Sequence, residues 1–314
     1  MKKISFIIAL LMLFSAFSAF AVAEDEEMKI IAFGDSITAA DKWQKHLEKA
    51  IGADVINAGV GGDTTNTAKA RFKKDVINKS PDVVIISLGI NDCAIDMARY
   101  VTLEDYKANM AYFIDECHKI GARVLVNIPT PVVDEQYLTR HKAEPFEAYG
   151  GPNGIVSIYA EACREVAREK NVVTADLNKI FLATDDYTKY FPDGVHPSDA
   201  GYKMYGEAVA EVFERLWLGD INGDGKVNQY DYVLVMREYF DTYTLDEKQT
   251  KRADINFDQT VNQYDYVLLK RHYFDTRKLT IDEQQRSDID NNGKINQYDY
   301  ILIARHYFGT YKIQ

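Results

Sequence analysis

Hydrophobic residues between positions 29 and 177 form short, nearly continuous runs that alternate with longer amphipathic segments. The apolar runs predict strands at 29–33, 53–57, 82–88, 123–128 and 172–177. The amphipathic segments predict helices at 42–51, 65–78, 103–120, 155–170 and 199–216. The run at 82–88 reads DVVIISL, which is typical of a strand covered on both faces. Regular alternation of strand and helix favours a three-layer α/β/α fold, with one parallel sheet between two layers of helices.

The first residues have the pattern of a secretion signal. Lys2 and Lys3 precede an apolar stretch at 4–20, and the sequence AVA at 21–23 offers an A-x-A cleavage site. The alternative is a membrane anchor, but the apolar run is short and the cleavage site fits well. We therefore expect residues 1–23 to be a signal peptide and the mature chain to be secreted, without membrane attachment. No other stretch of the sequence is long and apolar enough to cross a bilayer.

From residue 220 the pattern changes to a repeat. Three similar segments begin at Asp220, Asp254 and Asp288, a step of 34 residues each time. Repetition this regular marks stacked units of the same supersecondary structure. We therefore divide the chain into the signal peptide at 1–23, an α/β domain at 24–218 and a repeat module at 219–314.

Each repeat begins with an oxygen-rich loop that has the spacing of an EF-hand, with ligands at loop positions 1, 3, 5, 7, 9 and 12. The expected calcium ligands are Asp220, Asn222, Asp224, Lys226, Asn228 and Asp231, then Asp254, Asn256, Asp258, Thr260, Asn262 and Asp265, then Asp288, Asp290, Asn292, Lys294, Asn296 and Asp299. The residue at position 7 would offer its backbone carbonyl. Gln259 replaces glycine at position 6 of the second loop, where a sharp turn favours glycine, so we expect strain there. The alternative is a set of solvated acidic turns.

Polar residues follow the predicted strands of the α/β domain. Ser36 follows the first strand, a glycine-rich turn at 57–63 follows the second, and Asn91 follows the third. After the last strand, Asp193 precedes His196 by three residues within a turn. Because the carboxyl ends of parallel strands meet at one edge of a sheet, these groups are expected to lie together. The edge then holds a nucleophile, a base with an orienting carboxylate, and oxyanion donors, which is the set that acyl transfer needs.

In this order and spacing, the four blocks resemble the SGNH hydrolase superfamily over nearly all of residues 28–217. The resemblance implies that Ser36 is the nucleophile. It implies that His196 is the general base and then the acid that protonates the leaving alcohol, and that Asp193 fixes the imidazole tautomer. No cofactor is expected for this chemistry. The alternative is a degenerate member without activity.

The same resemblance implies an oxyanion hole. It would combine the backbone N–H groups of Ser36 and Gly62 with the side-chain amide of Asn91. Asp35 and Asp92 would be structural and would bond to backbone groups at the turns. Each oxyanion donor is typically worth about 3–4 kcal/mol of transition-state stabilisation.

The repeats resemble type I dockerin modules of bacterial cellulosomes, which are small helical calcium-binding domains. The resemblance rests on Asp at loop position 12, a short second helix and the tandem spacing, although dockerins usually have two repeats and this chain has three. It implies that the partner is a cohesin domain of a scaffoldin, contacted by loop positions 10 and 11 and by a basic residue further along the helix. These positions hold Gln229, Tyr230, Arg237, Gln263, Tyr264, Arg271, Gln297, Tyr298 and Arg305. The alternative is that duplication alone preserved these surface residues.

Charge and cysteine content narrow the possible partners. The formal net charge of −11 argues against nucleic-acid binding, which needs a basic face. Three cysteines do not make a disulfide framework. We expect Cys117 and Cys163 to be buried apolar residues, and no motif activates Cys93 as a nucleophile.

The longest irregular segment of the α/β domain is predicted at 131–154. We expect it to form one wall of the substrate site, with an ordinary surface excursion as the alternative. His141 lies in this segment without a nearby carboxylate turn, and His46 and His118 lie in predicted helices, so none is expected to act in catalysis. Residues 216–219 join the two halves with almost no linker, so we expect the halves to touch.

These observations predict an esterase that removes acyl groups, above all acetyl, from plant cell-wall polysaccharide. The esterase activity follows from the motif blocks, and the polysaccharide follows from the dockerin resemblance by association. Two alternatives stay open. One is a lipid or thioester hydrolase with the same residues, which would need an apolar acyl channel. The other is a calcium-dependent docking protein with an inert hydrolase half.

Overall fold

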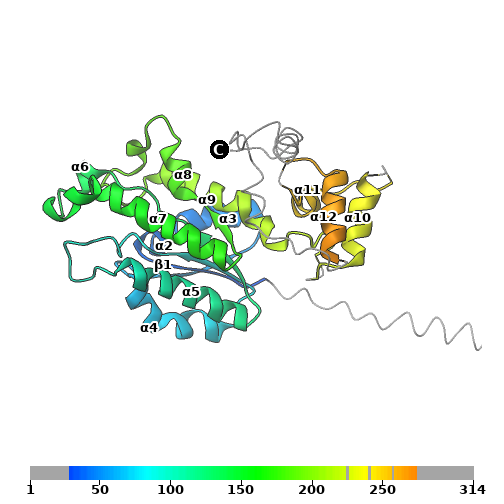
Figure 1. Cartoon of the computed structure of the whole chain (residues 1–314), viewed down its shortest axis with the longest axis horizontal. Helices are drawn as coiled ribbons and strands as arrows, with labels where there is room; N and C mark the ends of the chain where they lie inside the picture. Colours follow the sequence, from blue (N-terminus) through cyan, green and yellow to red (C-terminus); the bar gives the residue numbers. More distant parts are fainter. Residues whose placement is uncertain (1–27, 224–225, 240–241, 257, 274–314) are drawn as a thin grey trace, which may run out of the picture.

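A five-stranded parallel sheet forms the centre of the larger half of the molecule (Figure 1). The computed structural model describes residues 28–223, 226–239, 242–256 and 258–273. The strands are β1 Ile30–Gly34, β2 Val55–Gly59, β3 Val83–Ser87, β4 Arg123–Asn127 and β5 Val173–Ala175. Their order is β2-β1-β3-β4-β5, and every neighbouring pair is parallel. The order reverses between β1 and β3, which is where sheets of this kind bind ligands.

Helices cover both faces of the sheet and bury a separate apolar cluster on each face. One face is covered by α4 Thr65–Asp75, α5 Leu103–Lys119 and α7 Pro152–Glu169. The other is covered by α3 Trp43–Ile51, α8 Leu177–Leu182 and α9 Asp199–Phe213. All residues of β1 and β3 are buried, which explains their unbroken apolar sequences. Shorter elements connect them: α2 Ser36–Ala39, α6 Asp134–Tyr137, η1 Ile77–Lys79, η2 Glu144–Tyr149, η3 Tyr187–Tyr190 and η4 Glu214–Trp217.

Side-chain caps fix where several helices begin. Asp35, Thr64, Thr102 and Ser198 each accept a hydrogen bond from an N–H group in the first turn of α2, α4, α5 and α9, respectively. Replacement of such a cap by alanine typically costs about 1 kcal/mol. Because α2 and α4 start just after β1 and β2, their caps also hold the loops at the carboxyl edge of the sheet.

The described residues of the repeat region, up to residue 273, form a small helical unit at one end of the molecule (Figure 1). Its helices are α10 Gln229–Tyr239, α11 Glu247–Ala253 and α12 Gln263–Tyr273. The rings of Tyr232 and Tyr266, equivalent residues of the first two repeats, stack with their centroids 4.8 Å apart. A small core lies between the helices and consists of Ile221, Val235, Leu245, Ala253, Ile255 and Leu269.

The two halves are in contact through the short connection between them. Glu214 accepts a hydrogen bond of 3.0 Å from Arg252 Nε of the repeat region. The guanidinium groups of Arg123 and Arg252 lie 5.0 and 5.3 Å from the ring centroid of Trp217. Arg123 Nη2 of the α/β domain also lies 3.6 Å from Asp220 Oδ2 of the repeat region. The expected contact between the halves is therefore confirmed.

The predicted strands and long helices are confirmed, with ends that differ by up to three residues. The segment 131–154 is less irregular than expected, because it contains α6 and η2, and because α7 already begins at Pro152. Proline suits the first turn of a helix, where its missing N–H is not needed. No helix among the described residues is long and apolar enough to cross a membrane. The predicted signal peptide lies outside the described residues.

All three cysteines are free and buried. Cys117 and Cys163 pack in the cluster on the α5 and α7 face, as expected. Cys93 donates its thiol to Gly89 O, and burial raises the pKa of this thiol well above its usual value. A buried thiol of this kind is not a nucleophile.

Candidate active site

Ser36 lies at the start of α2, in the first turn after β1. Gly34 ends the strand, and only glycine fits there, because a Cβ atom would lie 2.6 Å from Ser87 O. Asp35 then accepts a hydrogen bond of 2.9 Å from the backbone N–H of Ile37 and so caps the short helix. This tight turn fixes Ser36 at the carboxyl edge of the sheet.

The side chains of Ser36, His196 and Asp193 form one hydrogen-bonded chain. Ser36 Oγ lies 2.8 Å from His196 Nε2, and His196 Nδ1 lies 2.7 Å from Asp193 Oδ2. Asp193 Oδ1 accepts the backbone N–H groups of Val195 and His196 at 2.9 and 2.7 Å. Partial burial works to raise the pKa of Asp193, but the hydrogen bonds from His196 and from the two backbone groups hold it well below its usual range. The carboxylate therefore stays ionised and can orient the imidazole.

The groups expected to form an oxyanion hole face the same cavity as Ser36. Gly62 and Asn91 both line this cavity, and Gly62 has a φ of 80°, which favours glycine. The glycine-rich turn passes close to the serine, since a Cβ atom built on Gly61 would lie 3.9 Å from Ser36 Cβ. Asn91 Nδ2 donates to Asp63 O at 3.0 Å, which fixes the orientation of its amide.

Arg71 holds this turn against the sheet, a role that the sequence analysis missed. Its Nε donates to Asp63 Oδ2 at 2.6 Å. Its two terminal nitrogens donate to Ala58 O and Gly34 O at 2.8 and 2.9 Å. Arg71 therefore ties the ends of β1 and β2 to the turn that carries Gly62.

Asp35 and Asp92 stabilise turns, as expected. Asp92 Oδ1 accepts a hydrogen bond of 3.0 Å from the backbone N–H of Thr65, at the start of α4. Burial raises the pKa of Asp35 to about 7 and the pKa of Asp92 to about 6. Neither residue is among those that line the cavity in front of Ser36.

This cavity has a volume of about 290 Å³. It is lined by Ser36, Gly62, Ile90, Asn91, Met97, Arg99, Tyr137, Arg140, His141, Val195 and His196. Tyr137, Arg140 and His141 come from the segment 131–154, so this segment forms a wall of the cavity in front of Ser36. No carboxylate is among these lining residues, although the whole chain has a net charge of −11.

His141 differs from its expected description. The sequence shows no carboxylate turn close to His141, but His141 Nδ1 lies 2.8 Å from Asp96 Oδ1, and both side chains are almost fully buried. The imidazole also stacks on the Tyr137 ring, with centroids 4.0 Å apart. Asp96 is distant in sequence and outside any regular element, so no periodic pattern could reveal the pair.

Arg140 contacts Asp193, which the sequence did not indicate. It donates to Asp193 O at 2.7 Å, and its other terminal nitrogen lies 3.4 Å from Asp193 Oδ2. The segment 131–154 therefore buttresses the turn that carries Asp193 and His196.

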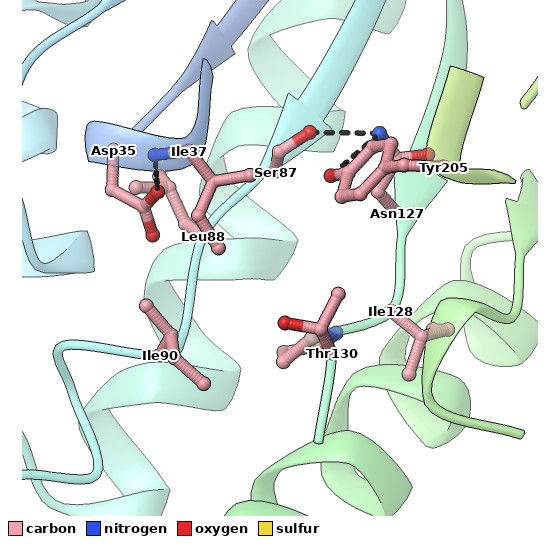
Figure 2. A pocket seen from close by; sticks show the side chains of 10 residues that line it. Asp35, Ile37, Ser87, Leu88, Ile90, Asn127, Ile128, Thr130 and Tyr205 are labelled. Carbon is pink, nitrogen blue, oxygen red and sulfur yellow. Dashed lines mark hydrogen bonds between the residues drawn. The ribbon is translucent and has the colours of Figure 1, made fainter. Parts of the chain in front are cut away.

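A second, smaller cavity lies between the ends of β1, β3 and β4 (Figure 2). Its volume is about 20 Å³, and Ile90 lines both cavities. Asn127 Nδ2 donates to Ser87 Oγ at 2.8 Å and to Tyr205 Oη at 3.2 Å. Among the described residues, the buried atoms Asn127 Oδ1 and Thr130 Oγ1 have no hydrogen-bond partner. The cavity therefore has the size and polarity to hold one water molecule.

The second repeat loop brings three of its expected calcium ligands together. Asp254, Asp258 and Asp265 each offer a carboxylate oxygen, and these atoms lie within 4.8 Å of one another. Burial raises the pKa of Asp254 to about 6 and the pKa of Asp265 to about 7, and the neighbouring carboxylates add to both shifts. Asp254 Oδ1 is buried without a hydrogen-bond partner among the described residues. A cluster of hard oxygen ligands with unbalanced charge fits calcium.

Other described positions of the first two loops also fit the expected calcium-binding loops. Gln259 has a φ of 67°, so the strain expected from the missing glycine is confirmed. In the first loop, Asp231 is buried and accepts the backbone N–H groups of Asn222 and Asn228 at 3.1 and 2.8 Å. Asp224 and the whole third loop from Asp288 lie outside the described residues.

The residues expected to contact a partner protein are exposed in the first two repeats. The Tyr230 and Tyr264 side chains are 63% and 47% exposed. The others in this group are Gln229, Arg237, Gln263 and Arg271. The third set, Gln297, Tyr298 and Arg305, lies outside the described residues.

Comparison with known protein families identifies both halves. The profile of the GDSL-like Lipase/Acylhydrolase family matches residues 32–204. The profile of the Dockerin type I domain matches residues 218–274 and 254–307. Together the two overlapping matches extend from the first repeat into the third.

Individual proteins resemble the first half. The "Uncharacterized lipoprotein YqeF" of Bacillus subtilis is 30% identical, over 50% of this chain and 73% of its own. The "Acetylxylan esterase" of Geobacillus stearothermophilus is 26% identical, over 60% of this chain and 95% of its own. The "Isoamyl acetate-hydrolyzing esterase 1 homolog" of Homo sapiens is 27% identical, over 60% and 79%. Among solved structures, the lipase/acylhydrolase from Enterococcus faecalis matches with a TM-score of 0.50 and 27% identity, over 60% of this chain and 96% of its own.

Proposed function

Because the chain belongs to the GDSL-like lipase/acylhydrolase family, we propose that it removes acetyl groups from plant cell-wall polysaccharide through Ser36, His196 and Asp193. The observation that carries the proposal is the chain of hydrogen bonds from the Ser36 hydroxyl to His196 and on to Asp193, at 2.8 and 2.7 Å, facing a cavity. This is the geometry that activates a serine for attack on an ester carbonyl.

The reaction proceeds in two acyl-transfer steps. His196 Nε2 takes the proton of Ser36 Oγ as this oxygen attacks the acetyl carbonyl. The carbonyl oxygen becomes an oxyanion, which accepts hydrogen bonds from the N–H groups of Ser36 and Gly62 and from the Asn91 amide. His196 then gives its proton to the leaving sugar oxygen. The bond to the sugar oxygen breaks in this step, and the acetyl group stays on Ser36. A water molecule, deprotonated by His196, then attacks this acetyl-serine, which releases acetate and restores Ser36.

The size and lining of the cavity support a short acyl group. Its volume of about 290 Å³ lies at the small end of ligand sites, which are typically about 300–1,000 Å³. Most of the side chains around Ser36 are polar, including Asn91, Arg99 and Arg140. The lipid alternative would need an apolar channel for a long chain. Two relatives are named for the hydrolysis of acetate esters, which favours acetyl as well.

We assign the second half to attachment. Dockerin type I domains bind calcium in general and dock to cohesin domains, so the proposed location is a secreted, cellulosome-associated assembly. When calcium is bound, it would supply the charge that joins Asp254, Asp258 and Asp265 and would rigidify the loop before α12. Exposed Tyr230 and Tyr264 are the kind of anchor that interfaces favour.

The test combines a nucleophile variant with a substrate panel. Ser36→Ala should abolish the hydrolysis of an aryl acetate, while Ser157→Ala should leave it unchanged. Ser157 is a matched control because its hydroxyl donates only to Asn153 O within α7 and does not line the cavity. Equal activity of Ser36→Ala and wild type would end the proposal.

The panel then decides the substrate. Acetate release should be fastest from acetylated xylan, mannan or pectin, and esters of longer acids should react more slowly. Faster hydrolysis of long-chain esters or thioesters would favour the lipid alternative. A wild type that is inert on every ester but binds a cohesin would favour the docking protein with an inert hydrolase half.

A further inference from the structure

The charge of the cavity is opposite to that of the molecule. The chain carries a net charge of −11, yet the described lining of the cavity holds Arg99 and Arg140 and no carboxylate. At long range such a protein repels an acidic polymer, so attraction to an acidic substrate would need positive charge placed at the site itself.

The two arginines are not equivalent. Arg140 donates to Asp193 O and lies 3.4 Å from Asp193 Oδ2, so its charge is already balanced by the carboxylate beside His196. Arg99 is exposed, and no hydrogen bond or ion pair joins it to any described residue. Its guanidinium group is therefore available to a ligand.

Arg99 is also close to the reacting groups. A Cβ atom built on Gly62 would lie 3.9 Å from Arg99 Nη1, so the guanidinium group stands beside the backbone of a proposed oxyanion donor. A group bound by Arg99 would thus belong to the sugar that carries the scissile acetyl or to its immediate neighbour.

The chemistry of guanidinium points to the class of ligand. Its planar donors match a carboxylate in a two-bond arrangement, whereas a neutral sugar is commonly bound on an open aromatic ring. Tyr137 is the tyrosine of the cavity lining, but its side chain is buried and its ring stacks on His141. The described part of the cavity therefore offers a charged anchor and no open aromatic platform.

We propose that Arg99 binds a carboxylate of the substrate, so that the enzyme prefers acetylated polysaccharide that carries uronic-acid residues. The inference rests on the proposed esterase function, since it names the substrate class of that same site. Arg99 is a binding residue in this assignment and takes no part in proton transfer.

The experiment compares two substrates that differ only in charge, with the full-length chain in calcium. One is an acetylated xylo-oligosaccharide with a uronic-acid side group, and the other is the same compound with that carboxyl converted to the amide. Wild type should show a kcat/KM roughly ten-fold higher for the acid, as expected for a hydrogen-bonded charged pair. The preference should shrink as sodium chloride is raised, because an exposed pair is screened.

Variants locate the preference. Arg99→Gln should bring the acid-to-amide ratio of kcat/KM close to one, and Arg99→Lys should retain part of it. Lys74→Gln is the matched control, because it removes the same charge from an exposed position on α4 that does not line the cavity, and the ratio should stay at the wild-type value.

Two outcomes would overturn the assignment of Arg99. One is a wild type that hydrolyses the acid no faster than the amide. The other is an Arg99→Gln variant that loses activity equally on both, which would make Arg99 a stabiliser of the oxyanion. Neither outcome affects the proposed esterase function, whose own failure would be hydrolysis of an aryl acetate that survives Ser36→Ala.

Discussion

The two halves of this chain hold their carboxylates in opposite ways. In the hydrolase half, Asp193 is surrounded by donors, with the His196 ring and two backbone N–H groups within 2.9 Å. In the second repeat loop, Asp254, Asp258 and Asp265 converge on one another, with ligand atoms within 4.8 Å. The first arrangement is complete from the chain alone, whereas the second places like charges together and fits a bound cation.

The hydrophobic cores of the two halves differ in size. The hydrolase half buries extensive apolar clusters on both faces of its sheet, while the repeat unit buries six hydrophobic side chains in its described part. Within these described residues, a core of six buried side chains gives little stability without a disulfide or a metal. The catalytic geometry should therefore be a property of the fold, and the docking geometry a property of the calcium complex.

The largest expected effect is the loss of the orienting carboxylate. Asp193→Asn keeps the shape of the side chain but can turn an N–H donor toward His196 Nδ1, which favours the wrong imidazole tautomer. We expect kcat for an aryl acetate to fall by about 10³–10⁴, with little change in KM. Steady-state kinetics of the purified variant measures this. A loss below ten-fold would mean that Asp193 does not orient the base.

The next largest effect should come from removing calcium with a chelator, which should affect the two halves differently. A ligand present at about a thousand times its Kd stabilises the folded state by about 4 kcal/mol, so removal of calcium should lower the unfolding temperature of the repeat unit strongly. The hydrolase half should keep its unfolding transition and its activity on an aryl acetate. Calorimetry of the full chain with and without a chelator checks both, and Asp265→Ala should mimic chelation in calcium. A repeat unit whose transition ignores the chelator would contradict calcium binding.

The parts of this structure that the sequence predicts are those with a periodic pattern of hydrophobic residues. The strands and long helices were predictable because buried β1 and β3 read as apolar runs and the helices as amphipathic segments. Ser36 could be placed at the carboxyl edge because it follows β1 directly, and His196 because it lies in the segment after the last strand, β5. In the structure they lie within hydrogen-bond distance, 160 positions apart in sequence.

The rest of the site could not be predicted because it comes from irregular segments. Arg99, Arg140 and the His141–Asp96 pair lie in loops whose paths depend on tertiary packing. Arg71 lies on a helix, yet its bonds to Gly34 and Ala58 cross between elements and leave no local pattern. The polar cavity around Asn127 likewise forms only when three strands are side by side.

A smaller effect should come from the buried carboxyl beside the nucleophile. Burial raises the pKa of Asp35 from 3.8 to about 7. Between these two pH values the carboxyl group is therefore protonated in the native state and ionised in the unfolded state. The stability that depends on this proton is fully present below the pKa of the unfolded state, and it is lost as the pH rises through the pKa of the folded state. Asp35→Asn keeps the acceptor for the Ile37 N–H and does not titrate. Its stability relative to wild type should therefore increase by about 3 kcal/mol between pH 5 and pH 8.

Urea unfolding of the hydrolase transition at the two pH values, in calcium, measures that difference. Asp193→Asn is the opposite control, because the pKa of Asp193 is lowered and its contribution is present above the unfolded pKa. Asp193→Asn should therefore lose stability relative to wild type at both pH values. A relative stability of Asp35→Asn that does not change with pH would mean that Asp35 stays ionised in the native state.

The smallest expected effect concerns the contact that joins the halves. Glu214 and Arg252 form an ion pair of 3.0 Å, and their side chains are only 11% and 14% exposed. A double-mutant cycle with Glu214→Ala and Arg252→Ala should give a coupling of about 1 kcal/mol in the unfolding free energy, because a shielded pair is screened less than a surface pair. The same cycle on Lys203 and Glu207, 61% and 62% exposed on α9, should give no measurable coupling. If the two cycles agree, the Glu214–Arg252 pair does not help to hold the halves together, and the contact of Arg252 with Trp217 would have to do so.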